Sequence, residues 1–259
     1  MRIIIVGCGI IGLATAYSLR DKGYDITIVC HDIPGVSSKA NAGIVTASFT
    51  PSPWPGFITL LKALIGSAGP LAIGLREVLS LEGLNWALKA YRAKGGRIDI
   101  LKSMAYRSLA LYENLLRRLG DISYRRGVLA LFSKASDAEL HSKLHGGRIL
   151  RADEVKSLGF EGFEAGVLAE DEIALDPVML VDSLRRELSE HTFLDDMVTS
   201  IKRLGNEVKV LLERGDSIKS DHVIIASGAW TPGIVRNLGV RIPVKPARGL
   251  TTLLKTVCP

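Results

Sequence analysis

The chain has 259 residues, of which 47% are hydrophobic and 23% are charged, and its formal net charge is +6. This composition excludes an intrinsically disordered chain, and the length suffices for one large domain or two interleaved ones. The three cysteines are Cys8, Cys30 and Cys258, and they form no CxxC pair. We therefore expect neither a disulfide framework nor a metal site, with Cys8 and Cys30 as buried small hydrophobic residues.

The basic residues are spread along the chain, and their densest cluster is Arg117, Arg118, Arg125 and Arg126. Only Tyr124 interleaves with this cluster, which is too little aromatic surface for a base-stacking platform. We therefore expect a solvated basic face and no nucleic acid as a partner. Because no charged and apolar leader precedes Arg2, we also expect a cytoplasmic protein.

The strongest motif lies at the start of the chain. An apolar run from Arg2 to Val6 predicts a strand, the sequence GCGIIG follows it, and a helix is expected to about Lys22. A second strand is expected from Asp25 to Cys30. This strand, glycine turn and helix are typical of a dinucleotide-binding unit, whose turn lies against a pyrophosphate. The alternative is a glycine turn that only packs the unit. The expected cofactor contacts are Gly7, Gly9, Ile10, Ile11 and Gly12.

The next segments differ in composition. Residues 33–55 are rich in Gly, Pro, Ser and Asn, which favours a binding loop over the cofactor. Residues 57–75 are strongly apolar, but Lys62 and several Gly and Pro residues interrupt them, which argues against a transmembrane span. Two short helices packed on a second domain are one interpretation of this segment. A segment lying on a membrane surface, at the inner face, is the other.

The middle of the chain alternates between helices and strands. A helix is expected over residues 98–120, and its apolar stripe is interpreted as core. The remaining expected elements are a strand at 127–133, a helix ending near Leu144, a helix over 176–190, a strand at 197–203 and its hairpin partner at 208–212.

A second candidate cofactor motif lies near the end of the chain. The apolar strand 221–225 opens into the small residues Ala226, Ser227, Gly228 and Ala229. Small residues after a strand let the backbone lie against a nucleotide, and Thr231-Pro232 can restart a helix. An ordinary strand-to-helix turn is the alternative.

At this point the sequence resembles the FAD-dependent oxidoreductases of the D-amino-acid oxidase superfamily, typified by D-amino-acid dehydrogenase, glycine and sarcosine oxidases and dye-linked proline dehydrogenase. The resemblance is carried by GCGIIGLATAYSLRDKGYDITIV, SSKANAGIVTASFTPSPWPG, ALDP, VIIASGAWTP and IPVKPARG. It implies an α/β fold in which a Rossmann-like FAD-binding domain is interleaved with an α+β substrate domain. The implied FAD-binding domain comprises residues 1–50 and 150–240, and the implied substrate domain comprises 51–149 and 241–259.

The resemblance also implies cofactor contacts. It places Ser38, Asn41, Ala42 and Gly43 beside the flavin pyrophosphate and ring. Val198 would offer its backbone to the adenine. Ala226, Gly228 and Ala229 would line the pyrophosphate.

Two departures from the family pattern are visible. The carboxylate that normally holds the ribose is replaced by Cys30, with His31 and Asp32 following. Asp32 could substitute, the backbone alone could hold the ribose, or Cys30 and His31 could admit the 2′-phosphate of NADP. The second departure is the end at Pro259, before the ring-side segment that the family pattern contains. We therefore expect a shortened or split gene product, with residues 251–257 beginning a strand.

The resemblance implies oxidation of the C–N bond of an amino acid or related amine, with hydride transfer to flavin. Arg248 is the candidate substrate-binding residue, and no catalytic residue can be named. An electron acceptor such as a quinone and a complementing subunit are the expected partners. The alternatives are a non-catalytic fragment that needs a second polypeptide and an NAD(P)-dependent dehydrogenase.

Overall fold

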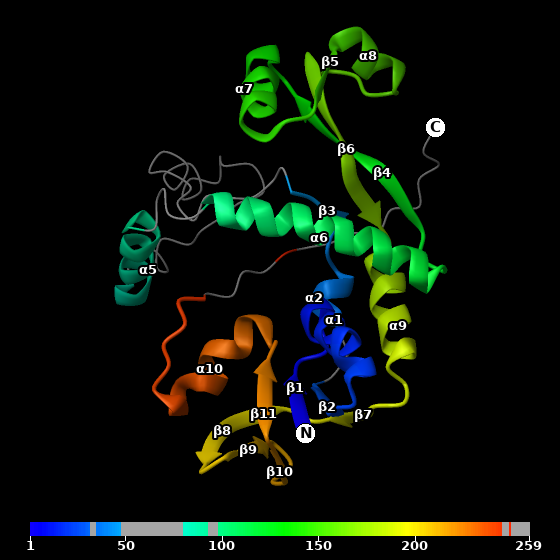
Figure 1. Ribbon diagram of the computed structural model, residues 1–259. Helices are drawn as coiled ribbons and strands as arrows, with labels where there is room; N and C mark the ends of the chain where they lie inside the picture. Colours follow the sequence, from blue (N-terminus) through cyan, green and yellow to red (C-terminus); the bar gives the residue numbers. More distant parts are fainter. Residues whose placement is uncertain (32–34, 48–79, 93–97, 245–248, 250–259) are drawn as a thin grey trace. The chain divides into compact units, whose positions relative to one another are not determined.

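The structure, a computed structural model, describes residues 1–31, 35–47, 80–92, 98–244 and 249 (Figure 1). The chain divides into two compact units. The first comprises Met1–Ile44, Asn114–Arg125 and Ala174–Pro259, and the second comprises Val45–Glu113 and Arg126–Ile173. Both units are therefore discontinuous in sequence. The domain boundaries that we placed from the sequence stay a prediction.

A parallel sheet forms the centre of the first unit. Its strand order is β11-β1-β2-β7, and all neighbouring strands run in the same direction. In this register Ile5 of β1 lies between Ile224 of β11 and Ile28 of β2. Helix α1 (Ile10–Leu19) connects β1 to β2, and the chain reaches β11 on the other side of β1 only much later. The strands are β1 (Arg2–Val6), β2 (Asp25–Cys30), β7 (Thr192–Asp195) and β11 (His222–Ile225).

Helices α1 and α9 lie on one face of this sheet, and a β-meander together with α10 lies on the other. Leu13 and Ala16 of α1 are fully buried, and α1 packs against α9. On the opposite face, Val6 and Val29 share a hydrophobic cluster with Ile201 and Val210 of the meander. The sheet is buried on both faces, as its almost continuous apolar strands predict. These layers contain α1 (Ile10–Leu19), α9 (Pro177–Glu187), α10 (Thr231–Val235), β8 (Val198–Leu204), β9 (Glu207–Leu212) and β10 (Ser217–Ser220).

Helix α9 begins where the sequence predicts a helix start. The side chain of Asp176 accepts hydrogen bonds from the backbone N–H groups of Val178 at 2.8 Å and Met179 at 3.0 Å. Pro177 occupies the first turn, where its missing N–H costs nothing. Inside the same unit, Asp121 accepts hydrogen bonds from Ser183 and Arg186 of α9.

The second unit is built around a four-stranded sheet. Strand β6 lies between β3 and β4, and β5 pairs with β6 in antiparallel orientation. Ala138, Ala165 and Val167 form a small buried cluster against Phe132. The elements that lie wholly or partly in this unit are β3 (Ile44–Val45), α5 (Leu81–Arg92), α6 (Ile98–Leu119), β4 (Tyr124–Phe132), α7 (Ala135–His145), β5 (Arg148–Arg151), α8 (Ala152–Ser157) and β6 (Ala165–Leu175).

Two expectations about this region need correction. Residues 33–55 are not a plain loop, because α2 (Val36–Lys39) and β3 form within them. The apolar stripe of α6 is only partly core, since Leu109 and Leu116 are buried but Met104 is 64% and Leu111 is 60% exposed. These two pairs lie about 140° apart around the helix, and a helix buries only the side that meets a neighbour. The apolar segment 57–75 lies outside the described residues.

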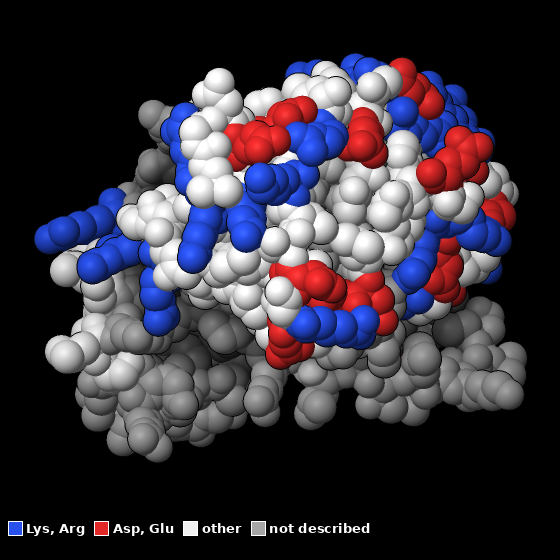
Figure 2. Space-filling model, turned by 90° about the horizontal axis from the view of Figure 1, so that it is seen from below, with Lys and Arg blue, Asp and Glu red and all other residues white. Residues whose placement is uncertain are grey.

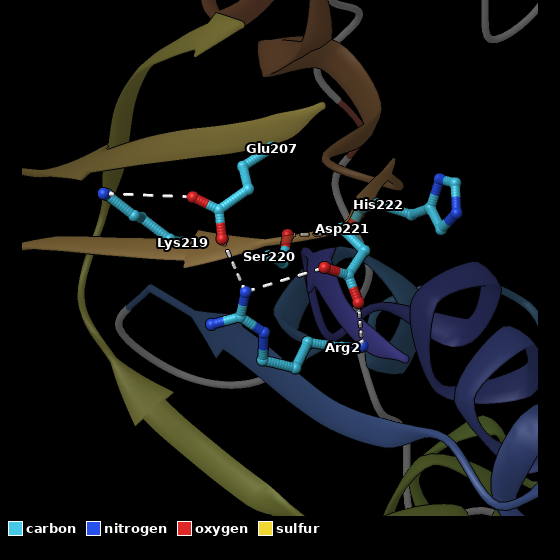
Figure 3. Close-up of polar contacts among 6 residues, drawn as sticks. All are labelled: Arg2, Glu207, Lys219, Ser220, Asp221 and His222. Atoms are coloured by element: carbon cyan, nitrogen blue, oxygen red, sulfur yellow. Dashed lines mark hydrogen bonds and ion pairs between the residues drawn. The ribbon is translucent and has the colours of Figure 1, made fainter. Parts of the chain in front are cut away.

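The starts of β1 and β11 are tied together by charged side chains (Figure 3). The Arg2 guanidinium lies 2.7 Å from Glu207 of β9 and 3.6 Å from Asp221, whose other oxygen accepts from the Arg2 backbone N–H at 2.8 Å. The Arg2 N–H holds the pKa of Asp221 below its usual value, and Glu207 raises the pKa of Arg2.

Figure 2 shows acidic side chains beside basic ones on the described part of the face it views. No described helix is both long and apolar enough to span a bilayer.

Candidate functional site

The two glycine motifs meet at the carboxyl ends of neighbouring strands. The backbone N–H of Ala226, just after β11, donates to the carbonyl of Val6 in β1 at 2.8 Å. Gly7 has φ +106°, and a Cβ there would lie 2.6 Å from the carbonyl oxygen of Ala226. Only glycine satisfies both the backbone angle and this close approach. Strand order reverses between β1 and β11, and ligands of open α/β sheets bind at such a switch point.

Two glycines, Gly9 and Gly12, frame the start of α1. Gly9 is the N-cap residue, in an extended conformation, and its carbonyl accepts from the Leu13 N–H at 3.0 Å. A Cβ at Gly12 would overlap the carbonyl of Gly7, so this glycine is required for helix α1 to approach the turn. The first amides of a helix have no intrahelical acceptor and attract anions. Ile11, in this first turn, is 68% exposed.

One of these amides already has a partner. The Ile10 N–H donates to the Ser38 hydroxyl oxygen at 2.9 Å, and a Cβ at Gly9 would lie 3.1 Å from the same oxygen. Ser38 therefore occupies one acceptor position at the helix end, and its hydroxyl hydrogen can be donated to an anion beyond it. This contact connects α2 to α1 although the two residues are 28 positions apart in sequence.

The segment around Ser38 is folded on itself. Asn41 donates from its side chain to the Ser38 carbonyl at 2.5 Å and accepts from the Gly43 N–H at 2.6 Å. Gly43 is buried and has φ +69°, and a Cβ there would overlap the carbonyl of Leu175. Ala42 between them is exposed. Structural contacts of the segment thus account for Ser38, Asn41 and Gly43, whether or not they also contact a cofactor.

The end of β2 corrects the expectation for the cysteines. Cys8 and Cys30 are buried, as expected, but they form a disulfide with their Cα atoms 5.3 Å apart. The absence of a CxxC pair led to a wrong prediction, because the adjacent parallel strands β1 and β2 bring together two cysteines that are 22 positions apart in sequence. His31, which follows Cys30, is exposed.

A carboxylate that the sequence analysis missed lies beside Cys30. In the register of β2 with β7, Cys30 is paired with Asp195, which is exposed at the same carboxyl edge of the sheet. The next residue, Asp196, donates its N–H to the Cys30 carbonyl at 2.8 Å. No sequence signal pointed to Asp195, because β7 and β2 are neighbouring strands in the sheet but lie far apart in the sequence. Asp32 lies outside the described residues.

The remaining predicted contacts are spread along the first unit. Val198 begins β8 and belongs to the hydrophobic core cluster. Gly228 has φ +54°, and a Cβ there would meet nothing within 4 Å. Ala229 is half-buried in the short 3₁₀ turn Gly228–Trp230. Arg248 and residues 251–257 lie outside the described part of the chain.

The second unit carries a buried polar cluster of its own. Glu172 is 3% exposed and accepts from the Thr46 hydroxyl at 2.5 Å and the Ala47 N–H at 3.0 Å. Burial lowers the pKa of His141, and the neighbouring His145 lowers it further. Among the residues that the structure describes, no three His, Cys, Asp or Glu side chains gather as a metal site would require.

Comparison with known proteins gives a consistent result. The family described as FAD dependent oxidoreductase (DAO) matches residues 2–258. The D-amino acid dehydrogenase of Rhizobium rhizogenes is 26% identical over 290 residues, covering 100% of this chain and 68% of that protein. The D-proline dehydrogenase of Pyrobaculum islandicum is 32% identical over 267 residues, covering 96% of this chain and 65% of that protein.

Solved structures show the same fold. Iminodiacetate oxidase from Chelativorans sp. superposes with a TM-score of 0.64 at 22% identity, covering 93% of this chain and 58% of its own. Glycine oxidase from Geobacillus kaustophilus gives a TM-score of 0.66 at 18% identity, covering 92% and 58%. The expected fold class is therefore confirmed. This chain spans about two thirds of the length of the curated relatives.

Proposed function

We propose a function from the premise that this chain belongs to the FAD dependent oxidoreductase (DAO) family. The chain binds FAD and contributes to oxidation of the C–N bond of an amino acid or related amine. The observation that carries this proposal is the meeting of Gly7 and Ala226 at the switch point between β1 and β11, beside the amino end of α1. Family membership favours FAD over the nicotinamide alternative.

The residues around the turn fit a pyrophosphate. A Cβ at Gly9 would point toward the Ser38 hydroxyl, so a glycine here keeps the space before α1 clear of side chain. The Ile11 N–H and the Ser38 hydroxyl are the proposed donors to the phosphate oxygens, because the Ile10 N–H is bound to Ser38. Ile10 therefore acts through Ser38, which it orients. Gly7 and Gly12 bring strand and helix close enough for this arrangement.

The adenosine end is assigned to the edge formed by β2, β7 and β8. The backbone of Val198, at the start of β8, is proposed to contact the adenine. Cys30 is the last residue of β2, and His31 follows it. Asp195 is the proposed carboxylate for the ribose hydroxyls, since it is exposed beside the position where Cys30 replaces the acid. A charged hydrogen bond of this kind contributes about 1.5 to 3 kcal/mol.

The flavin end is assigned to residues from two segments. Asn41, Ala42 and Gly43 lie on the first, and Ala226, Gly228 and Ala229 lie on the second. At this end FAD would supply the hydride acceptor for the substrate carbon that carries the nitrogen. The contribution of the protein is to orient the substrate and keep water out, and Arg248 is proposed to bind a substrate carboxylate through its guanidinium.

Partners of this chain follow from the same premise. An acceptor such as a quinone would reoxidise the cofactor, and a further polypeptide segment would complete the substrate side. The matched structures are longer than this chain, which covers 58% of each, and this supports the proposed further segment. A location in the cytoplasm, at the inner face of the membrane, is consistent with a quinone acceptor and can be tested by flotation with anionic vesicles.

FAD binding is the experiment that tests the proposal. The purified chain is titrated into FAD, and quenching of flavin fluorescence reports the complex. Gly9→Val should remove binding, because its side chain enters the space before α1. Gly233→Val, in a helical glycine with nothing within 4 Å of its Cβ, is the matched control and should retain binding. Unaltered affinity of the Gly9 variant would contradict the assignment.

Activity is measured in a second experiment. Dye-linked assays with proline and a panel of D-amino acids are run on this chain with FAD in excess. The same assays are then run with the relatives' C-terminal third supplied as a separate polypeptide. Turnover that requires both polypeptides supports a divided active site, whereas turnover by this chain alone places every necessary residue within it.

A further inference from the structure

The disulfide joins two parts of the candidate cofactor site. Cys8 lies between Gly7 and Gly9 in the turn after β1, and Cys30 is the last residue of β2. Their Cα separation of 5.3 Å is within the usual range for a disulfide. A covalent bond therefore runs from the pyrophosphate turn to the strand end that faces the ribose in this family of folds.

Neighbouring contacts show what the bond holds. The Gly7 N–H donates to the Val29 carbonyl at 2.9 Å, and the Asp196 N–H donates to the Cys30 carbonyl at 2.8 Å. The bond thus connects the turn, through β2, to the edge where Asp195 lies. Cys8 is 5% and Cys30 is 2% exposed, so the sulfur atoms are inside the protein and do not offer a surface for a ligand.

We propose that Cys8 and Cys30 are positioning residues whose oxidation state sets the affinity for FAD. The disulfide fixes the glycine turn in the conformation that accepts the pyrophosphate, and reduction releases it. The inference rests on the proposed FAD site. Formation of the bond removes two electrons and two protons from the two thiols. The oxidant is a small-molecule or protein disulfide, which becomes two thiols by exchange.

The glycines around Cys8 give the reason for an effect on binding. The hydrogen bonds of Gly7 and Ile10 restrain the two ends of the turn, whereas glycine on both sides of Cys8 widens the backbone conformations open at its middle once the disulfide is reduced. If the reduced chain holds the competent turn in about one molecule in ten, the apparent dissociation constant rises about tenfold. Burial of the bond makes exchange slow, so each redox state persists long enough to be measured separately.

The test compares the two states of the full 259-residue chain. Thiols are counted after unfolding without reductant, and one free thiol, from Cys258, is expected. FAD is then titrated into the oxidised chain, into the chain reduced with a phosphine, and into reduced chain reoxidised with glutathione disulfide. We expect about tenfold weaker binding after reduction and recovery after reoxidation.

Two variants serve as controls. Cys258→Ser should keep the response to reduction. The double variant Cys8→Ser and Cys30→Ser should bind FAD as weakly as the reduced chain and show no response. A role confined to stability would lower the thermal midpoint on reduction but leave the dissociation constant unchanged at temperatures where the chain is folded.

The possible failures are distinguishable. Three free thiols in the unreduced chain, or equal FAD affinity in both states, would overturn the inference and leave the FAD site intact. An oxidised chain that binds no FAD would remove the FAD site and this inference together.

Discussion

The two glycine motifs of the first unit differ in how tightly the protein packs around them. At the β1–α1 turn, a Cβ on Gly7 or Gly12 would meet backbone at once. At the β11–α10 turn, a Cβ on Gly228 would meet nothing within 4 Å. The first motif is therefore needed for folding as well as for any ligand. At the second motif an added Cβ at Gly228 would meet no neighbour, so substitutions there test binding with little effect on packing.

The largest expected effect is at Gly12. Gly12→Ala places a Cβ against the Gly7 carbonyl, and helix α1 must shift away from β1. We expect a loss of roughly 3 kcal/mol or more in the free energy of unfolding, measured by urea titration of the FAD-free chain. Gly233→Ala, in open space, is the control. A Gly12 variant as stable as the control would show that the turn is not tightly packed.

The second-largest effect, on FAD affinity, is expected at Asp195, which is exposed beside Cys30. Asp195→Asn removes the carboxylate proposed for the ribose but leaves the strand register unchanged. We expect FAD to bind about tenfold more weakly, equivalent to about 1.4 kcal/mol, by fluorescence titration. Asp25→Asn, exposed at the opposite end of β2, should bind as the parent does. Equal effects of the two variants would contradict the assignment of Asp195.

A smaller effect on stability is expected at the second motif. Gly228→Ala keeps the chain free of clashes but puts a side chain at φ +54°, which costs about 1 kcal/mol. Gly239→Ala, at φ +72° and also in open space, should cost the same. Only the Gly228 variant should weaken FAD binding. If both variants bind FAD equally well, the second motif is a plain strand-to-helix turn.

The smallest expected effect is a pH dependence of stability that arises from two exposed carboxylates. A hydrogen bond from the Arg2 N–H holds the pKa of Asp221 below its usual value. Hydrogen bonds, above all the one from Ser183, do the same for the pKa of Asp121. A lowered folded-state pKa contributes stability above about pH 4, which is lost as pH falls through the folded pKa. Both side chains are exposed, so the loss is small.

Urea midpoints measured between pH 6 and pH 3 check this dependence. Asp221→Asn should reduce the fall in the midpoint with acid but leave the midpoint near pH 3 almost unchanged. A variant whose midpoint falls with pH as steeply as the parent's would show that Asp221 does not contribute. FAD affinity at neutral pH should be the same in both proteins, because this network lies at the amino ends of the strands.

Local patterns were sufficient for most elements of the first unit. The sequence predicted β1 and β2 to their final residues, because apolar runs bounded by glycine or polar residues have few other conformations. The start of α9 followed from Asp176-Pro177 for the same local reason. Recognition of the family depended on these same blocks, and the comparisons confirm it.

Contacts between distant segments were decided only by the tertiary structure. The pairing of Cys8 with Cys30, the hydrogen bond from Ile10 to Ser38 and the position of Asp195 beside Cys30 all require a particular strand order and register. A linear sequence specifies which residues can form a strand, but not which distant strand each will neighbour. That choice depends on the burial of both sheet faces together, so the residues that complete the site became visible only in the folded chain.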